Sequence, residues 1–278
     1  MKQKKRFLAF FFLGFMGIST LYAQYDFMHG ATFSTFDRGY VFMAPNIVEQ
    51  LGFGAHQWDV IVVNSGTYSI EHDHGIPFIN FYWNDGTQER YLMLINDCFM
   101  VLYSDNTMPA FLGLRGHHMI SNGGSPGWIS RIYTVRASST LREGNLVYAA
   151  TPERLFLHIN RVWAVEGGVG ERLYINIFSR EWGVGCVHLW ISIGYVHFSR
   201  PYLFQHNSRP KRIRLSGTNW WDGEIYSEQE LRDTPNFQRI CLPRYLASGS
   251  LQIEILEIFP GIRYNHMCIN SIVTHCSP

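Results

Sequence analysis

The sequence predicts an all-β protein with two β domains, and two observations support this fold class. Short runs of β-branched and aromatic residues alternate with polar residues at a period of two, and Gly, Pro and Asn separate the runs. Aromatic residues make up 15% of the chain and charged residues 16%, a balance typical of β-rich proteins with well-filled cores. The 278 residues suffice for one large or two modest domains.

The N-terminal domain is expected over residues 24–120 as a β-meander. A short helix is predicted at 45–51, because Pro45 suits a first helical turn and Gly52 a C-terminal cap. Asn84-Asp85-Gly86 is a strong tight-turn signal, and Asn96-Asp97 turns the chain again. The predicted strands lie at 58–63, 66–71, 76–83, 89–95 and 98–103. This order resembles a small, calycin-like half barrel.

A linker is predicted at 121–130, and a second β domain at 131–278. The linker contains Ser121-Asn122-Gly123-Gly124-Ser125-Pro126-Gly127, whose residues propagate neither a strand nor a helix. In the second domain, 251–259 alternates Ile and Leu with polar residues, and Pro260-Gly261 ends the run.

A targeting signal is predicted at residues 1–23. Its positive n-region contains Lys2, Lys4, Lys5 and Arg6, its apolar core spans 7–18, and a small-residue site precedes Gln24. The apolar core is shorter than the ~20 residues that a membrane-spanning helix needs, so we expect cleavage rather than an uncleaved anchor. The mature protein is then exported, to the periplasm, the medium or the cell surface, and is not an integral membrane protein.

The charge balance argues against nucleic acid as a partner. Removing the signal takes away four of the 23 basic residues and none of the 22 acidic ones, which leaves a net charge of about −3. A chain of this charge has no broad cationic field for nucleic acid or acidic lipid.

We expect neither catalysis nor a cofactor. The chain has no Gly-x-Ser-x-Gly elbow and no His-Glu-x-x-His motif. Gly167-Gly168-Val169-Gly170 suggests a phosphate loop, but a phosphate cradle needs a helix after it, and residues 173–177 read as a strand. A glycosidase-like pairing of Glu166 with Glu171 stays open as an alternative.

No metal site is expected from the cysteines or histidines. The five cysteines lack metal-ligand spacing, and Cys98, Cys186, Cys241 and Cys268 lie in apolar surroundings, which predicts buried free thiols. A Cys268–Cys276 disulfide is the alternative. His72-Asp73-His74 offers two imidazoles but no identifiable third ligand, and the segment precedes a turn.

The C-terminal half resembles a known binding module over about residues 135–273. The similarity rests on Trp163-Ala164-Val165-Glu166-Gly167, Asn207-Ser208-Arg209-Pro210-Lys211 and Phe259-Pro260-Gly261-Ile262-Arg263-Tyr264, in that order. These segments resemble the NADase-type glycan-binding domain, also described as the translocation domain of streptococcal NAD glycohydrolase. The resemblance implies a jelly-roll, discoidin-like (F5/8 type C-like) β-sandwich that binds rather than catalyses.

The chain departs from this family where acidic residues are usual. Residues 155–160 carry none, and His266, Met267, Asn270 and Ser271 occupy the segment near Cys268. Jelly rolls of this type often hold a structural calcium through oxygen ligands. Because the carboxylates are missing here, we expect no calcium.

The predicted ligand contacts are Trp220, Trp221, Asp222, Asn207 and Arg209. Adjacent tryptophans in a strand point to opposite faces, so one indole is expected in solvent beside a carboxylate. Such a pair suits sugar recognition, in which a ring stacks on C–H groups and a carboxylate orients hydroxyls.

Other residues of this half are predicted to be structural. Trp163 and Tyr195 are expected in the core. Arg212 and Arg214 alternate with apolar residues and share the solvent face of one strand with Lys211 nearby; contact with an anionic glycan is the alternative.

Together these features predict an exported, non-catalytic protein whose C-terminal sandwich recognises a glycan or another cell-envelope or host-surface ligand. The alternative is a periplasmic structural or protein-interaction module without a glycan ligand. A third candidate is a hydrolase with an unrecognised site.

Overall fold

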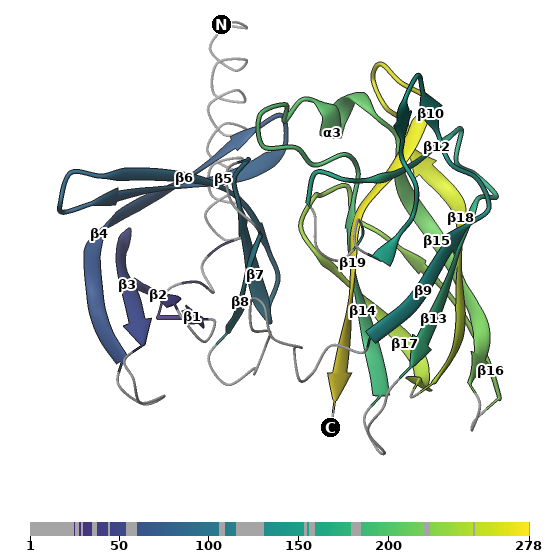
Figure 1. Cartoon of the computed structure of the whole chain (residues 1–278), viewed down its shortest axis with the longest axis horizontal. Helices are drawn as coiled ribbons and strands as arrows, with labels where there is room; N and C mark the ends of the chain where they lie inside the picture. The colour runs from purple at the N-terminus through teal and green to yellow at the C-terminus, as the bar shows by residue number, and fades with distance from the viewer. Residues whose placement is uncertain are drawn as a thin grey trace, which may run out of the picture.

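A computed structural model of the chain shows two β units side by side (Figure 1). It describes Tyr25, Met28, Leu155 and the ranges 30–34, 38–43, 45–53, 60–105, 109–114, 131–152, 159–178, 185–219, 223–246 and 248–277. The predicted signal and the predicted linker lie outside the described residues. All pairings between the named strands are antiparallel, and the all-β fold class is confirmed.

The first unit is a closed barrel in which the strands follow one another in chain order. Its strands are β1 (Thr32–Ser34), β2 (Arg38–Met43), β3 (Ile47–Phe53), β4 (Val60–Asp73), β5 (Ile76–Trp83), β6 (Gln88–Ile95), β7 (Phe99–Tyr103) and β8 (Ala110–Leu114). The up-and-down order is as predicted. The sheet also closes, because β1 pairs with β8 through Phe33 and Leu114.

The helix predicted at 45–51 is wrong, because this segment forms strand β3. Asn46 adopts a left-handed backbone with φ of 66°, which makes a turn after Pro45 instead of a first helical turn. Val48 is buried between two more exposed neighbours, so the segment follows the period of a strand. The two strands predicted at 58–63 and 66–71 are one strand, β4.

Strand β7 is buried at all five positions because both of its faces are covered. Met100 and Leu102 pack inside the barrel, whereas Phe99, Val101 and Tyr103 pack outside it, against the second unit. A strand covered on both faces reads as a continuous apolar run rather than an alternating one.

The second unit is a sandwich of two sheets, with strand orders β12-β19-β14-β17 and β16-β15-β18-β13-β9. The larger sheet contains β9 (Arg131–Ala137), β13 (Arg172–Phe178), β15 (Arg209–Asn219), β16 (Gly223–Glu230) and β18 (Ser248–Phe259). The smaller contains β12 (Trp163–Glu166), β14 (Gly185–Ile193), β17 (Gln238–Leu246) and β19 (His266–Ser277). A hairpin of β10 (Arg142–Glu143) and β11 (Leu146–Val147) and a short helix, α3 (Leu203–His206), lie at one end.

The sandwich core forms where alternate residues of the two sheets meet. In β13, Leu173, Ile175 and Ile177 are buried while Tyr174 and Asn176 face solvent. Trp163 on the opposite sheet is fully buried, and its Nε1 donates to the carbonyl of Ser139 at 3.0 Å. The prediction that Trp163 belongs to the core is confirmed. Burial of each large apolar side chain of this core, such as Leu173 or Ile175, stabilises the fold by about 1.5–3 kcal/mol.

The glycine-rich segment 167–170 is a tight turn between strands. Gly167, Gly168 and Gly170 all have positive φ, and a Cβ on Gly168 would lie 2.4 Å from Met267 Cβ. Strand β13 follows at Arg172, as the rejection of a phosphate loop required.

The barrel packs on the outer face of the smaller sheet of the sandwich. Phe99 of the barrel meets Trp190 edge-on at a centroid distance of 5.8 Å and contacts Phe237 at 5.0 Å. The backbone N–H of Ile95 donates to Asn236 Oδ1 at 3.2 Å. These contacts place the β4–β5 turn of the barrel beside α3.

Within the described residues, no helix combines the length and the apolar character needed to span a bilayer.

The cysteine predictions are partly corrected. Cys268 is a buried free thiol, as predicted, which argues against a bridge to Cys276. Cys98 is free and half-buried. Cys241, however, is exposed, because it faces outward in β17 while its neighbours Ile240 and Leu242 enter the core.

Candidate functional site

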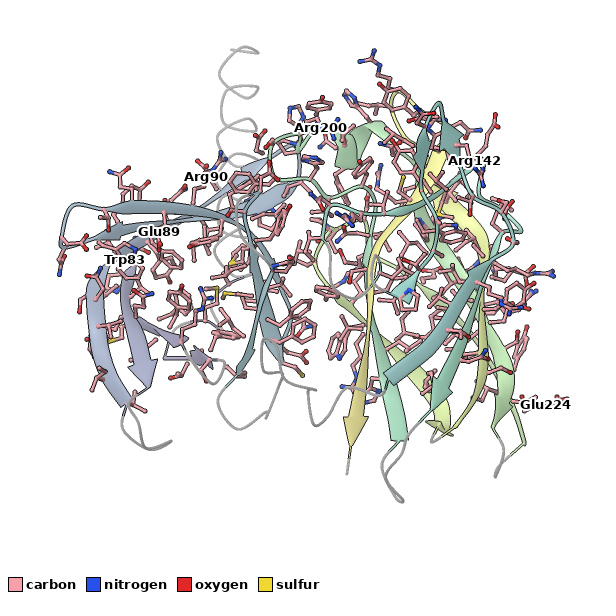
Figure 2. The ribbon with its side chains drawn as sticks, in the orientation of Figure 1. Trp83, Glu89, Arg90, Arg142, Arg200 and Glu224 are labelled. Atoms are coloured by element: carbon pink, nitrogen blue, oxygen red, sulfur yellow. The ribbon has the colours of Figure 1, made fainter. Side chains whose placement is uncertain are left out.

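Three of the predicted ligand contacts, Trp220, Trp221 and Asp222, lie outside the described residues. The residues on either side of them, Asn219 and Gly223, pair at the end of the β15–β16 hairpin. Figure 2 shows Glu224, next to this segment, at the end of the molecule away from Arg200. The binding role of these three residues stays a prediction.

Asn207 and Arg209 are described, and both are buried. Arg209 donates to both carboxylate oxygens of Asp233, at 2.7 Å from Nε and 2.6 Å from Nη2. Its Nη1 donates to the carbonyl of Asn207 at 2.8 Å, and Asn207 Nδ2 donates to the carbonyl of Leu203 at 2.9 Å. Both side chains are thus used to hold α3 and its neighbouring loops.

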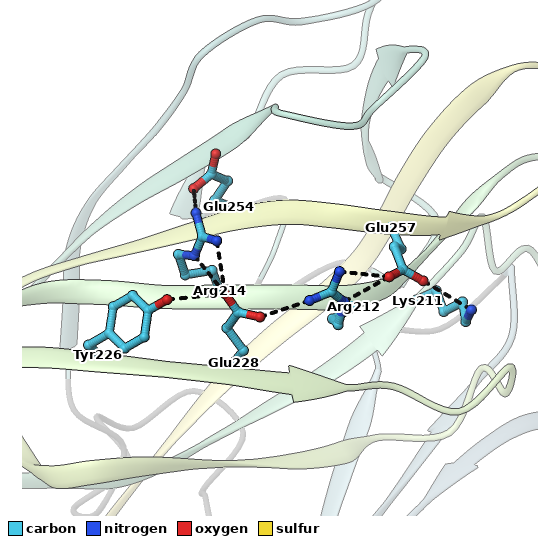
Figure 3. Close-up of polar contacts among 7 residues, drawn as sticks. All are labelled: Lys211, Arg212, Arg214, Tyr226, Glu228, Glu254 and Glu257. Carbon is cyan, nitrogen blue, oxygen red and sulfur yellow. Dashed lines mark hydrogen bonds and ion pairs between the residues drawn. The ribbon is translucent and has the colours of Figure 1, made fainter.

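The basic run of β15 is paired with carboxylates on the outer face of the larger sheet (Figure 3). Arg214 bonds Glu228 at 2.8 Å and Glu254 at 3.2 Å. Arg212 bonds Glu228 at 2.8 Å and Glu257 at 2.7 Å. Lys211 bonds Glu257 at 3.0 Å. This charge ladder leaves none of the three cations without a carboxylate, which favours the solvated-face interpretation over contact with an anionic glycan.

A pocket of about 520 Å³ opens at the end of the sandwich where α3 and β10 lie. We call it the tyrosine–histidine pocket, because its lining includes four tyrosines and three histidines. These are Tyr148, Tyr195, Tyr202, Tyr264, His74, His206 and His266. Tyr195, expected in the core, is half-buried and lines this pocket.

Three segments carry the tyrosines of the pocket. Tyr148 follows β11, Tyr195 and Tyr202 lie at the two ends of the connection between β14 and α3, and Tyr264 lies between β18 and β19. Backbone bonds hold these segments in place: Ala164 N–H of β12 donates to the carbonyl of Tyr148 at 3.1 Å, and Tyr264 N–H donates to that of His206 at 2.8 Å. The rings therefore converge although they are far apart in sequence.

Two glycines allow the loops to approach so closely. Gly194 has a φ of 83°, and a Cβ there would lie 2.6 Å from the Phe204 ring. A Cβ on Gly261 would lie 2.4 Å from the carbonyl oxygen of His206. Both distances are too short for any other residue without a shift of the backbone.

The aromatic rings form contacts along the pocket wall. Tyr264 and His266 lie parallel, with centroids 5.9 Å apart and an interplanar angle of 8°. His206 meets Tyr264 at 6.2 Å and Tyr202 at 5.1 Å. These contacts hold the rings in fixed orientations, which preserves flat apolar surfaces beside polar groups.

Glu143 from β10 supplies a carboxylate to the pocket. Its Oε2 accepts a hydrogen bond from the Tyr148 hydroxyl at 2.9 Å, and its Oε1 lies 3.7 Å from His266 Nδ1. Burial, reinforced by Glu143, raises the pKa of Tyr148, so this hydroxyl stays a donor at neutral pH. Burial also raises the pKa of Cys268, which keeps that thiol neutral in the pocket floor.

Arg200 and Arg263 stand on the exposed side of the pocket. Arg200 Nη2 lies 3.0 Å from His197 Nε2, and the Arg263 guanidinium carbon lies 5.3 Å from the Tyr264 ring centre. Burial and then the Arg200 charge lower the pKa of His197, so this imidazole is neutral and accepts from Arg200.

The barrel contributes one residue to this pocket. His74 lies in the β4–β5 turn with a φ of 50°, next to Gly75. Its ring meets Tyr202 edge-on at 6.2 Å. One wall of a pocket formed mainly by the sandwich therefore depends on how the barrel is docked.

A larger cleft of about 1040 Å³ lies between the barrel and the sandwich. Its aromatic floor is formed by Trp190 and Phe237, which already pack against Phe99 of the barrel. Two of its charged groups, Arg209 and Asp233, are paired with each other. We assign this cleft to the domain boundary and take the tyrosine–histidine pocket as the candidate site.

The described lining of the pocket combines aromatic rings with one carboxylate and two guanidinium groups. In the described ranges, no group of three or more His, Cys, Asp or Glu side chains is placed to hold a metal ion. The two carboxylates considered for hydrolysis, Glu166 and Glu171, do not line the pocket.

Of the residues that line the pocket, sequence reasoning singled out only Asn207 as a ligand contact. Tyr264 lies within the segment 259–264 that carried the family resemblance, and Asn207, which was predicted, lines the pocket. Tyr148, Tyr202 and His206 have no spacing that would have found them, because only the loops of the folded sandwich bring them together.

No protein-family profile matches the sequence, and no curated protein sequence matches it. Several solved structures are similar to parts of the chain. A family 32 carbohydrate-binding module from C. perfringens NanJ, in complex with galactose, is 13% identical; the match covers 51% of this chain and 91% of that chain, with a TM-score of 0.36. The family 32 module from Streptococcus pneumoniae EndoD is 8% identical, covering 51% and 94%, with a TM-score of 0.35.

A third similar structure spans nearly the whole chain. It is a two-domain protein of unknown function from Bacteroides fragilis, 8% identical, and the match covers 93% of this chain and 98% of that chain with a TM-score of 0.33. Identities and TM-scores are low throughout, so we draw the function from the residues of the pocket. The resemblance to the NADase-type glycan-binding domain stays a prediction.

Proposed function

We propose that the protein is an exported, non-catalytic binding protein that recognises carbohydrate through the tyrosine–histidine pocket. One observation carries the proposal: four tyrosines and three histidines, from segments that are far apart in the sequence, line one pocket of about 520 Å³. This volume lies within the range of about 300–1,000 Å³ that is usual for small-molecule sites.

The lining suits the two sides of a sugar ring. One face of a pyranose carries C–H groups, which pack on aromatic rings such as the half-buried Tyr264. The hydroxyl groups need both donors and acceptors: the arginines donate, while the remaining lone pairs of Glu143 and the oxygen of the Tyr148 hydroxyl accept. A purely apolar docking surface would lack these polar groups.

Binding rather than turnover is proposed because no catalytic constellation is recognised in the sequence. Export is proposed from the n-region, apolar core and cleavage site predicted at residues 1–23. A glycan ligand outside the cytoplasm fits both parts of the proposal.

A glycan array with the mature protein tests the proposal. We expect saturable binding to a defined set of glycans, lost in Tyr264→Ala because the stacking surface is removed. Tyr226→Ala is the matched control, since Tyr226 is an exposed tyrosine of β16 that does not line the pocket. Equal loss in both variants, or no binding to any glycan, would overturn the proposal.

One observation favours the protein-interaction alternative. Val60, Ile61, Val62 and Val63 at the start of β4 are consecutive, and each is more than half exposed, which is unusual for such residues. If this run joins two copies of the chain, Ile61→Ser will convert a dimer to a monomer in sedimentation velocity. If the wild-type protein sediments as a monomer at all concentrations, dimerisation through this run is excluded.

A further inference from the structure

The tyrosine–histidine pocket is lined by more basic than acidic side chains. Arg200 and Arg263 line it, whereas Glu143 is the one acidic side chain among its described lining residues. Asp73 lies 3.8 Å from His74 Nε2 but does not line the pocket.

The single carboxylate is already engaged. Glu143 accepts from the Tyr148 hydroxyl and faces His266 Nδ1, so its charge is directed toward the pocket wall. The two arginines have no carboxylate partner among the described residues. In the charge ladder of Figure 3, by contrast, Arg212 and Arg214 each contact two carboxylates.

Arg263 also stands beside an aromatic surface of the pocket. Arg263 precedes Tyr264, with its guanidinium carbon 5.3 Å from the Tyr264 ring centre. Arg200 precedes Tyr202 by two residues, and Figure 2 places Arg200 at the end of the molecule where α3 lies. An anionic group on a sugar that stacks on Tyr264 would therefore lie within reach of the Arg263 guanidinium.

We propose that the pocket selects an acidic glycan, one whose sugar carries a carboxylate or a sulfate, with Arg200 and Arg263 as the groups that bind the anion. This inference rests on the proposed function and names the ligand class of the same pocket. Guanidinium groups bind such anions through paired N–H donors, which adds geometric selectivity to the charge attraction.

The selectivity is local rather than a property of the whole molecule. With the signal removed the chain carries about −3, so its overall field does not attract an anion. Attraction therefore comes from contacts inside the pocket, and because both arginines are exposed, salt will weaken it over a Debye length of about 8–10 Å.

Matched glycan pairs that differ in charge test the proposal by calorimetry. The pairs are oligogalacturonate with its methyl ester, 3′-sialyllactose with lactose, and 3′-sulfolactose with lactose. We expect the acidic member of at least one pair to bind the full-length mature protein tenfold or more tightly. The first two pairs report a carboxylate and the third a sulfate.

Variants of the two arginines test which side chains cause the preference for the acidic glycan. Arg263→Gln and Arg200→Gln should reduce the preference for the acidic member to less than threefold, because each variant weakens binding of the acidic member more than binding of its neutral partner. Arg142→Gln is the matched control, because Arg142 is an exposed arginine of β10 that does not line the pocket. Arg142→Gln should keep the wild-type preference.

Two failures are distinguishable. If neutral members bind as tightly as acidic ones, and Tyr264→Ala abolishes both, the acidic selectivity is wrong and carbohydrate binding stands. If no member of any pair binds and the glycan array is blank, both proposals are wrong. A preference that survives in both arginine variants would also overturn the assignment of these two groups.

Discussion

Arg209 has a buried guanidinium whose three nitrogens all donate to acceptors within the protein. Two bonds go to Asp233 and two to the carbonyls of Phe204 and Asn207, at 3.3 and 2.8 Å. The planar fork of arginine suits this pattern, and lysine could not reproduce it. Arg209 is the first residue of β15, and its bonds tie this strand to α3. Its pairing therefore positions a wall of the pocket.

Replacing Arg209 should therefore cost stability rather than a ligand contact. We expect Arg209→Ala to lower the free energy of unfolding by about 3 kcal/mol, because the buried carbonyls of Phe204 and Asn207 lose their donor. Arg212→Ala, on the exposed charge ladder, should cost much less, because ion pairs in solvent contribute little to stability. Urea denaturation measures both. Equal effects of the two variants would contradict the structural role of Arg209.

Among the elements, the β15–β16 and β15–β18 strand pairs carry the charge ladder. Side-chain bonding to Arg214 lowers the pKa of Glu228, and bonding to Lys211 and Arg212 lowers the pKa of Glu257. A carboxyl whose folded pKa is depressed stabilises the fold above its unfolded pKa, and that stability is lost as pH falls through the folded value. Both carboxyls start from an ordinary value of 4.5.

The ladder thus predicts a loss of stability below about pH 4.5. Chemical denaturation between pH 3 and 7 should show a steeper fall for the wild-type protein than for Glu228→Gln combined with Glu257→Gln. Glu224→Gln is the control, since Glu224 is exposed at the end of β16 and takes no part in the ladder. Identical pH profiles for all three proteins would mean that the ladder contributes nothing.

The strand elements were predictable from the sequence to different extents. The strands at 76–83 and 89–95 were found because Asn84-Asp85-Gly86 marks the turn between them. Segment 45–51 was assigned to a helix, because Pro and Gly at its ends are shared signals of helices and turns. The left-handed backbone of Asn46 starts a strand instead of a helix. It depends on the pairing of β3 with β2 and β4, which no local sequence signal indicates.

The candidate site was less predictable than the strands. Tyr148, Tyr195, Tyr202 and Tyr264 come from three loops, and no sequence period connects them. Loop convergence depends on sheet order, in which β12 and β14 both pair with β19. Sequence reasoning could name aromatic residues near Gly and Pro, but it had no means of telling which of them would meet.

At the scale of the whole molecule, the barrel and the sandwich share one hydrophobic cluster. It joins the outer wall of the barrel to the smaller sheet through Phe99, Trp190 and Phe237. Because the β4–β5 turn carries His74 into the tyrosine–histidine pocket, docking of the barrel is part of the site. We therefore expect the two units to unfold together.

Hydrogen exchange with mass spectrometry tests this coupling. Peptides from β6 and β13 should lose protection at the same urea concentration in the wild-type protein. Phe237→Ala removes a buried ring from the shared cluster, at a cost of about 3–5 kcal/mol, and should separate the two transitions. Ile253→Ala, a deletion inside the sandwich core, should lower stability without separating them. Separate transitions in the wild-type protein would contradict the shared cluster.

The measurement that tests the central claim most directly is ¹⁹F NMR of the mature protein labelled with 3-fluorotyrosine and titrated with the glycan that binds it best. Single Tyr→Phe variants assign the resonances. We predict that the ¹⁹F resonances of Tyr264 and Tyr202 shift along a common binding curve, whereas the resonance of Tyr226, on the larger sheet, does not shift. Shifts at Tyr226 or in the barrel, with the pocket tyrosines unchanged, would contradict the assignment of the tyrosine–histidine pocket as the binding site.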